Sequence, residues 1–114
     1  MSQITTHILD THSGNPAEAV PVSIYRKEAN DGWQILKQAE TDKDGRVSDF
    51  FADNLTLDAG IYRLKFETCV YFDKLDQQSF YPYVDVVFEI DDSGRHYHVP
   101  LLISAFGYST YRGS

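Results

Sequence analysis

Two histidines, His96 and His98, stand two positions apart in a segment whose alternating apolar residues predict a β-strand. Side chains with this spacing point to the same face of a strand, so both imidazoles can serve one site. Imidazole titrates near neutral pH and also binds metals, so the pair fits either acid–base catalysis or a zinc site. A zinc site would need His7 or a carboxylate as its third ligand, and no Cys cluster or H-E-x-x-H motif favours it.

The two faces of this predicted strand differ in character. The set expected to face the core consists of Tyr97, Val99, Leu101 and Ile103. His98 falls on the other face, which continues through Pro100 and Leu102, whereas His96 lies beside the turn 91–94 and is expected to be exposed. An outer face that is also apolar predicts an oligomer interface or a ligand channel.

His7 and Arg46 are the next candidates for a site. His7 lies between Thr5 and Leu9 in another predicted strand, on a face of the same character. Arg46 follows the turn 42–45, which begins like a calcium loop, but its glycine comes too early and no glutamate stands at the twelfth position. Calcium is therefore not expected, and Arg46 is either a solvated surface residue or a clamp for the oxygen atoms of a ligand.

The sequence as given closes with Tyr111-Arg112-Gly113-Ser114, directly after a strand-like segment. This segment carries a ring hydroxyl, a guanidinium group and a serine hydroxyl, all of which bind or orient ligands, and a glycine that permits close approach of the backbone. Terminal residues usually fray, so such a concentration of polar groups is unusual there. We expect this segment to be part of a site. The hydroxyls of Thr5-Thr6 and Ser109-Thr110 stand in no nucleophile-elbow motif.

Composition restricts the domain count and the partners. A chain of 114 residues suits a single domain over 1–114. Ten basic residues against 17 acidic ones give a net charge of -7, so neither nucleic acid nor a membrane surface is an expected partner. A lone cysteine, Cys69, and the lack of a long apolar run or signal peptide lead us to expect a cytoplasmic protein. Without a P-loop or G-x-G-x-x-G motif, no nucleotide cofactor is expected.

Short alternating segments separated by turn residues predict an all-β sandwich or barrel. Turns are expected at Asn15-Pro16 and at the later Asn-, Asp- and Gly-rich clusters. One short helix is expected within 67–75, where Cys69, Val70, Phe72 and Asp73 suit an amphipathic turn better than alternation. The predicted strands lie near 3–10, 19–28, 33–40, 46–50, 61–66, 82–90, 95–104 and 106–112.

Several of these segments together resemble one family, the 5-hydroxyisourate hydrolases, which are transthyretin-related proteins of urate breakdown. The resemblance extends over essentially the whole chain, and its most specific part is the closing Tyr-Arg-Gly-Ser, which transthyretin, the hormone carrier of the same fold, lacks. The segments that carry it are Thr5-Thr6-His7-Ile8-Leu9-Asp10-Thr11, Thr41-Asp42-Lys43-Asp44-Gly45-Arg46, Tyr62-Arg63-Leu64-Lys65-Phe66-Glu67-Thr68, His96-Tyr97-His98-Val99-Pro100-Leu101-Leu102 and Tyr108-Ser109-Thr110-Tyr111-Arg112-Gly113-Ser114.

The resemblance implies a transthyretin-like, immunoglobulin-like β-sandwich of two four-stranded sheets with one short helix. It further implies a homotetramer, a dimer of dimers, with active sites at the mouths of a central channel. The implied substrate is 5-hydroxyisourate, hydrolysed without a cofactor or a metal to 2-oxo-4-hydroxy-4-carboxy-5-ureidoimidazoline. This chain departs from the family at Ser104-Ala105-Phe106, where Ser-Pro-Tyr is common, and at Phe80-Tyr81-Pro82, where Phe-Phe-Pro is common. The first departure touches a turn expected at a subunit interface.

The resemblance also implies roles for individual residues. The catalytic residues are His7, Arg46, His98 and Ser114, and the residues that bind substrate are His7, Arg46, Tyr111, Arg112, Gly113 and Ser114. The two histidines would act as base and acid, in an order that the sequence leaves open. The planar guanidinium would bind ring oxygens and disfavour a neighbouring imidazolium. Two alternatives remain at this point: a transthyretin-type carrier without turnover, and a zinc hydrolase.

Overall fold

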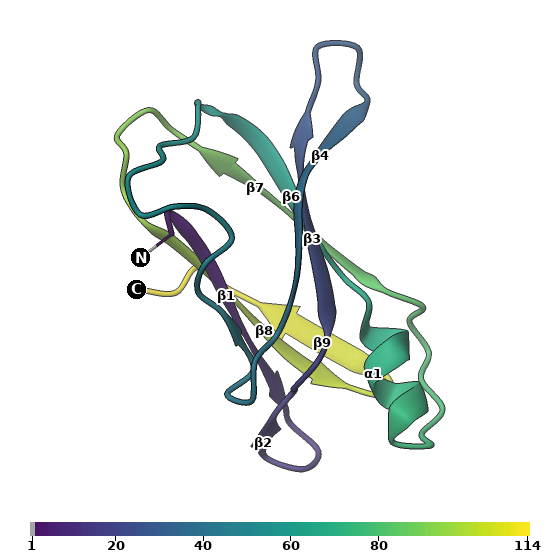
Figure 1. Ribbon diagram of the computed structural model, residues 1–114. Helices are drawn as coiled ribbons and strands as arrows, with labels where there is room; N and C mark the ends of the chain where they lie inside the picture. Colours follow the sequence, from purple (N-terminus) through teal and green to yellow (C-terminus); the bar gives the residue numbers. More distant parts are fainter. Residues whose placement is uncertain (1) are drawn as a thin grey trace.

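The sheet that carries the candidate residues is built around two parallel neighbours, β1 (Ile4–Asp10) and β8 (Tyr97–Ser104). The computed structural model describes residues 2–114. Strand β9 (Gly107–Thr110) extends this sheet by antiparallel pairing with β8. Two short segments, β2 (Asn15–Pro16) and β5 (Arg46–Val47), both pair with β1 in antiparallel fashion. Figure 1 shows this sheet as one layer of a sandwich.

The second sheet is fully antiparallel. Its strands follow the order β4 (Trp33–Glu40), β3 (Pro21–Lys27), β6 (Gly60–Phe66) and β7 (Val84–Ile90). Strand β6 leads into α1 (Thr68–Lys74), which lies at one end of the sandwich (Figure 1). This helix, the one helix within residues 2–114, has seven residues and is too short to cross a bilayer.

Apolar alternation along the strands builds the core between the sheets. The predicted inward set of β8 is confirmed, because none of its four side chains exceeds 6% exposure. The inward residues of β3, β6 and β7 behave in the same way, although Phe88 is only partly covered. The largest fully buried side chains are Tyr62, Phe50, Phe66, Ile4, Ile8, Ile24, Leu64, Ile90, Leu101 and Ile103. A continuous core of this kind leaves the outer faces free to carry function.

Helix α1 forms where the sequence predicted one, but it buries a different set of residues. Thr68, Tyr71 and Phe72 face the protein, whereas Val70 is 40% exposed. The helical period explains which residues are buried, because residues three and four positions apart lie on the same face of a helix. Tyr71 and Phe72 therefore share a face with Thr68. The Tyr71 hydroxyl donates a 2.8 Å hydrogen bond to the buried carboxylate of Asp10, which fastens the helix to β1.

The other strands agree with the sequence, with two corrections. Asn15-Pro16, expected as a turn, forms β2, because these two residues pair in antiparallel fashion with Leu9 and Asp10 at the edge of β1. The strand expected near 46–50 is limited to two residues. The sequence predicted four strands in this sheet, and the structure has five. The sheet is nevertheless only four strands wide, because β2 and β5 pair with different parts of the same edge of β1.

Candidate active site

Strand pairing brings His7 and Arg46 side by side. In the antiparallel pairing of β1 with β5, His7 stands opposite Arg46 and Thr6 stands opposite Val47. Directly opposed residues project to the same face of a sheet. Val47 is 2% exposed and belongs to the core, so Arg46 and His7 project outward. The half-buried imidazole of His7 and the exposed guanidinium of Arg46 therefore share the outer face of the sheet.

A tight turn fixes the position of Arg46. One carboxylate oxygen of Asp42 accepts hydrogen bonds from the backbone N–H groups of Asp44 and Arg46, at 2.9 and 3.0 Å. Gly45 adopts φ +74°, and a β-carbon there would lie 2.6 Å from the carbonyl oxygen of Ile8. Only glycine fits both constraints. The turn leads from β4 in one sheet to β5 in the other, so it connects the two layers of the sandwich and is not a β-hairpin.

Parallel pairing of β1 with β8 places Thr5 opposite His98. The Thr5 hydroxyl lies 2.8 Å from Nδ1 of His98 and 2.9 Å from Nε2 of His96. The two imidazole rings are nearly parallel, at 20°, with centroids 6.4 Å apart. With Nδ1 engaged by Thr5, the second nitrogen of His98, Nε2, is the one left to meet a substrate.

The C-terminal segment packs directly against His98. The backbone N–H of Gly113 donates a 2.9 Å hydrogen bond to the His98 carbonyl, which forms an isolated antiparallel bridge. A β-carbon on Gly113 would lie 2.6 Å from Cδ2 of His98 and 3.1 Å from Cγ of Pro100. The glycine was predicted to allow close approach to a ligand, whereas the group that approaches closely in this structure is the imidazole.

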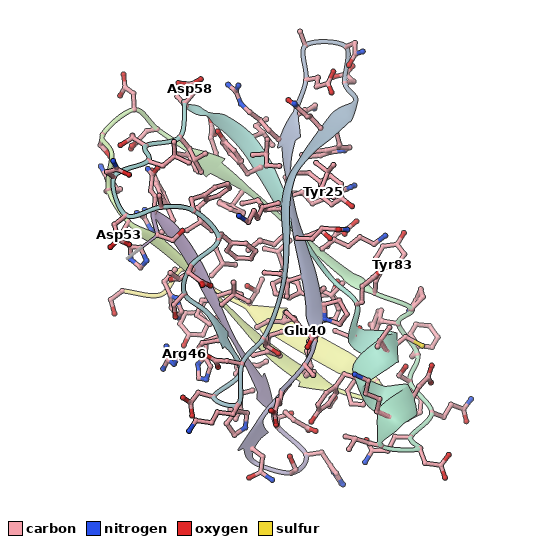
Figure 2. The ribbon with its side chains drawn as sticks, viewed as in Figure 1. Tyr25, Glu40, Arg46, Asp53, Asp58 and Tyr83 are labelled. Atoms are coloured by element: carbon pink, nitrogen blue, oxygen red, sulfur yellow. The ribbon has the colours of Figure 1, made fainter. Side chains whose placement is uncertain are left out.

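These elements surround a pocket of about 140 Å³ on the outer face of the first sheet. It is lined by Thr5, Thr6, Arg46, Ser48, His96, His98 and Ser114. In Figure 2, Arg46 lies on the same side of the molecule as the yellow C-terminal segment. The pocket therefore brings together an imidazole, a guanidinium group and several hydroxyls, in a volume suited to a small polar ligand.

Burial and charge keep the two outer-face histidines neutral. Desolvation, followed by the charge of Arg46, lowers the pKa of His7, although a hydrogen bond to the Asp44 backbone partly opposes this. Desolvation also lowers the pKa of His98, with further contributions from Arg46, His96 and His7. One guanidinium therefore acts on both rings, and both favour the neutral form that a general base requires.

Two residues of the C-terminal segment point elsewhere. Tyr111 and Arg112 line a second pocket of about 160 Å³, between β7 and β8, together with Glu89. The Arg112 guanidinium lies 4.8 Å from the ring centroid of Tyr97, as in a cation–π contact. Within one chain, these two predicted substrate-binding residues are therefore separated from Arg46 and Ser114, and only His98 borders both pockets.

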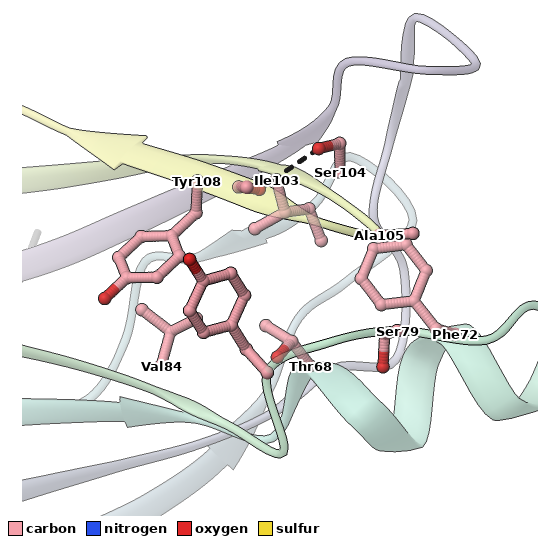
Figure 3. Close-up of a pocket in the computed structure, with 10 residues that line it drawn as sticks. Thr68, Phe72, Ser79, Val84, Ile103, Ser104, Ala105 and Tyr108 are labelled. Carbon is pink, nitrogen blue, oxygen red and sulfur yellow. Dashed lines mark hydrogen bonds between the residues drawn. The ribbon is translucent and has the colours of Figure 1, made fainter.

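A third hollow lies beneath helix α1 and offers no binding space. Figure 3 shows Thr68 and Phe72 of the helix on one side of this hollow and Ile103 of β8 on the other. All three side chains are buried, and the space between them is too narrow for even a water-sized group. This hollow is part of the packing of α1 on the sandwich, and it is not a candidate site.

The sequence identified three of the seven residues that line this pocket, Arg46, His98 and Ser114, and missed the other four. His7, Arg46, His98 and Ser114 gather on one face as predicted, although His7 stands beside the pocket lining. His96 is exposed as predicted, yet it also lines the pocket and contacts Thr5. The parallel register of β1 and β8 makes this contact, and no local pattern in the sequence reveals that register.

The side chains present suit proton transfer and anion stabilisation. A neutral imidazole, a planar guanidinium group and a serine hydroxyl can activate water and stabilise an oxyanion at a carbonyl group. Within residues 2–114, no three His, Cys, Asp or Glu side chains are grouped so that they could hold a metal ion. The third ligand that a zinc site would require is thus not supplied within the described part of the chain.

The fold and site together define a transthyretin-like β-sandwich with a basic, histidine-containing pocket on the outer face of one sheet. The sequence matches the family described as the HIUase/Transthyretin family over residues 4–113, and this chain belongs to that family. A relative from Schizosaccharomyces pombe, named probable 5-hydroxyisourate hydrolase, is 44% identical, with 97% of this chain and 90% of the relative covered.

Two solved structures are similar to this chain. The 5-hydroxyisourate hydrolase of Klebsiella pneumoniae matches with a TM-score of 0.85 and 39% identity, over 97% of this chain and 98% of that one. Sea bream transthyretin, solved in complex with thyroxine, matches with a TM-score of 0.92 and 30% identity, over 98% of this chain and 95% of that one. The expected fold class is thereby confirmed, and the fold alone does not separate an enzyme from a carrier.

Proposed function

We propose that this chain hydrolyses 5-hydroxyisourate to 2-oxo-4-hydroxy-4-carboxy-5-ureidoimidazoline, opening a cyclic amide without a cofactor. The observation that carries this proposal is the position of His98, whose Nδ1 is held by Thr5 while the ring borders a pocket with Arg46 and Ser114. The names of the relatives from Schizosaccharomyces pombe and Klebsiella pneumoniae support the same substrate.

The reaction follows from the groups in the pocket. The neutral imidazole of His98 removes a proton from water as the water oxygen bonds to the amide carbonyl carbon. The guanidinium of Arg46 stabilises the negative charge that develops on the carbonyl oxygen. The C–N bond of the ring then breaks, and the departing nitrogen receives the proton that His98 took from water, either directly from His98 or by way of its neighbour His7. Ser114 orients the water through its hydroxyl.

The proposal includes the assembly and the location of the enzyme. Four copies form a dimer of dimers whose outer sheet faces enclose a channel, with the pockets at its mouths. Tyr111 and Arg112 are separated from Arg46 within one chain, and assembly at the channel is the arrangement in which they could reach the substrate. The cytoplasmic location is supported by the composition, with Cys69 as the single cysteine.

A direct assay tests the function. Purified protein mixed with freshly generated 5-hydroxyisourate should accelerate the decay of its ultraviolet absorbance, and His98→Asn should lower kcat/KM by about two to four decades. His12→Asn is the matched control, because His12 is exposed on the loop after β1 and lies outside the pocket. Equal rates for the wild type and His98→Asn would contradict the proposed role of His98.

The same assay separates the alternatives. The similarity to sea bream transthyretin favours a carrier as the second candidate, and a carrier would bind a ligand in the channel without consuming it. A zinc hydrolase would lose its activity on prolonged chelation and regain it with zinc. We expect turnover that chelation leaves unchanged, because Arg46 occupies a place where a zinc site would present a neutral or anionic ligand.

A further inference from the structure

The hydroxyl of Thr5 is the single link between two histidines that do not touch each other. Thr5 is 5% exposed, and its Oγ1 is within 2.9 Å of both Nδ1 of His98 and Nε2 of His96. The ring centroids are 6.4 Å apart, so the two imidazoles have no direct hydrogen bond. The far ring, that of His96, belongs to a residue exposed to solvent.

A hydroxyl has one proton to donate, and this couples the protonation of the two rings. If Thr5 donates its proton to His96, then it accepts one from Nδ1 of His98. In that arrangement Nε2 of His98 has a free lone pair, as a base toward the substrate requires. The opposite arrangement places a proton on Nε2 of His98, and that form can act only as an acid.

The surroundings of His98 make the first arrangement useful. A proton taken up at Nε2 would create an imidazolium on a partly desolvated ring, and Arg46, His96 and His7 further disfavour positive charge there, as the lowered pKa of His98 reflects. His96 stands at the end of the same hydrogen-bond chain and reaches water. Transfer of the proton to His96 would place the positive charge on the ring of a solvent-exposed residue, where water stabilises it.

We propose that Thr5 is a positioning residue that also relays a proton, joining His98 in the pocket to His96 at the surface. When Nε2 of His98 accepts a proton from water, Nδ1 releases its proton to Oγ1 of Thr5, and the Thr5 hydroxyl proton passes to Nε2 of His96. One proton enters the chain and His96 becomes the imidazolium, so charge and atoms balance. This role rests on the proposed hydrolysis and adds two residues to it.

The first test observes the rings without substrate. The relay requires both neutral histidines to carry their proton on Nδ1, whereas a free histidine side chain in water favours the Nε2-protonated form. Nitrogen-15 NMR of the imidazoles distinguishes these tautomers. We expect the Nδ1-protonated form at His96 and His98 in the wild type and in Thr5→Ser, and a shift toward the Nε2-protonated form in Thr5→Val. Unchanged tautomers in Thr5→Val would overturn the proposal.

The second test measures turnover of 5-hydroxyisourate. Thr5→Val should lower kcat at least tenfold with KM within about twofold, and Thr5→Ser should recover most of the loss. His96→Asn should reduce kcat by a similar factor, and the double variant should be no slower than Thr5→Val, since both changes break one chain. Thr11→Val is the control, because the Thr11 hydroxyl likewise ties the end of β1 to β8, by donating to the Ile103 carbonyl, but lies outside the pocket and contacts no histidine.

The outcomes separate the relay from the hydrolysis itself. Additive losses in the double variant, or full activity in His96→Asn, would show that Thr5 only ties β1 to β8. His96 is exposed, so His96→Asn is expected to fold and keeps the proposal testable if Thr5→Val does not. A wild type with the expected tautomers but no turnover would refute the proposed function, whereas an active wild type with the opposite tautomers would refute the relay alone.

Discussion

Burial and the charge of Arg46 both lower the pKa of the two outer-face histidines, and this gives the site a pH dependence with a definite sign. A base must be neutral, and an imidazole is neutral above its pKa. Burial and the charge of Arg46 lower the pKa of His7 and of His98, so activity persists to a lower pH than an ordinary histidine, with a pKa of about 6.5, would allow.

Replacement of Arg46 by glutamine should raise the lowest pH at which the enzyme stays active. Without the guanidinium, the pKa of both histidines rises toward the ordinary value, so the acid limb of the kcat/KM profile shifts to higher pH. Arg46→Lys is the control, because it keeps the charge and loses the planar fork, so its rate should fall while the limb stays in place. A pH profile with the same acid limb in Arg46→Gln would contradict the electrostatic role.

Gly113 tests how closely the backbone must approach His98. A β-carbon there would lie 2.6 Å from the imidazole, so Gly113→Ala should displace the ring and lower kcat at least tenfold, with little change in melting temperature. Gly107→Ala is the matched control, since its β-carbon would meet only the Ser104 hydroxyl, at 3.7 Å. Activity close to wild type in Gly113→Ala would mean that the ring position is not critical.

Strand β1 is the element that assembles the site, because it contributes to the site through both of its edges. Its pairing with β5 brings Arg46 to His7, and its pairing with β8 brings His98 to Thr5. The strands themselves were predictable from alternation, since period-two patterns depend on local sequence alone. Register across neighbouring strands depends on contacts between distant segments. For this reason His96 was predicted as a surface residue and its link to Thr5 was not foreseen.

The C-terminal segment is the second element whose role can be isolated. Truncation after Thr110 removes the Gly113 bridge to His98, the Arg112 contact with Tyr97 and the Ser114 side of the pocket. Most of the segment is exposed, so we expect a loss of at least a hundredfold in kcat/KM and a fall of only a few degrees in melting temperature. Activity should be compared at a temperature where both proteins are folded.

Intermediate variants show which contact matters. Ser114→Ala should reproduce part of the loss in rate, since Ser114 lines the pocket with Arg46 and His98. Arg112→Ala removes the cation–π contact with Tyr97 without changing that pocket, so a loss of rate in this variant would support the proposal that Arg112 reaches the substrate in the assembled protein. Full activity in the truncated protein would exclude the segment from the site.

At the scale of the whole molecule, the sandwich serves enzymes and carriers alike. The fold of this chain matches sea bream transthyretin with a higher TM-score than it matches the Klebsiella pneumoniae hydrolase. The sequence identity is nevertheless higher to the hydrolase than to the transthyretin. The backbone therefore does not determine which chemistry takes place, and we expect the difference to lie in side chains such as His7, Arg46 and His98. These three residues were identifiable from the sequence because they stand in recognisable sequence motifs. Their contacts were not identifiable, because contacts depend on tertiary structure.

We expect copies of the chain to meet at the exposed aromatic residues that lie at the far end of β8 from His98. Phe106 is 68% exposed and Phe80 is 70% exposed, and the rings of Phe80, Tyr81 and Tyr108 form a contiguous cluster. A patch of this kind on a small acidic protein is unfavourable in water unless another surface covers it. In this chain Phe106 stands where the family commonly has tyrosine.

We therefore expect sedimentation velocity to give four times the chain mass of 13.0 kDa, with Phe106→Asp shifting the protein to smaller species. The introduced carboxylate would be desolvated in the interface, which disfavours association. Ile35→Asp is the control, because Ile35 is 47% exposed on β4, in the sheet that does not carry the pocket. If the channel mouths complete the sites, the smaller species should also lose activity per chain. A fully active monomer at micromolar concentration would contradict both the tetramer and its part in catalysis.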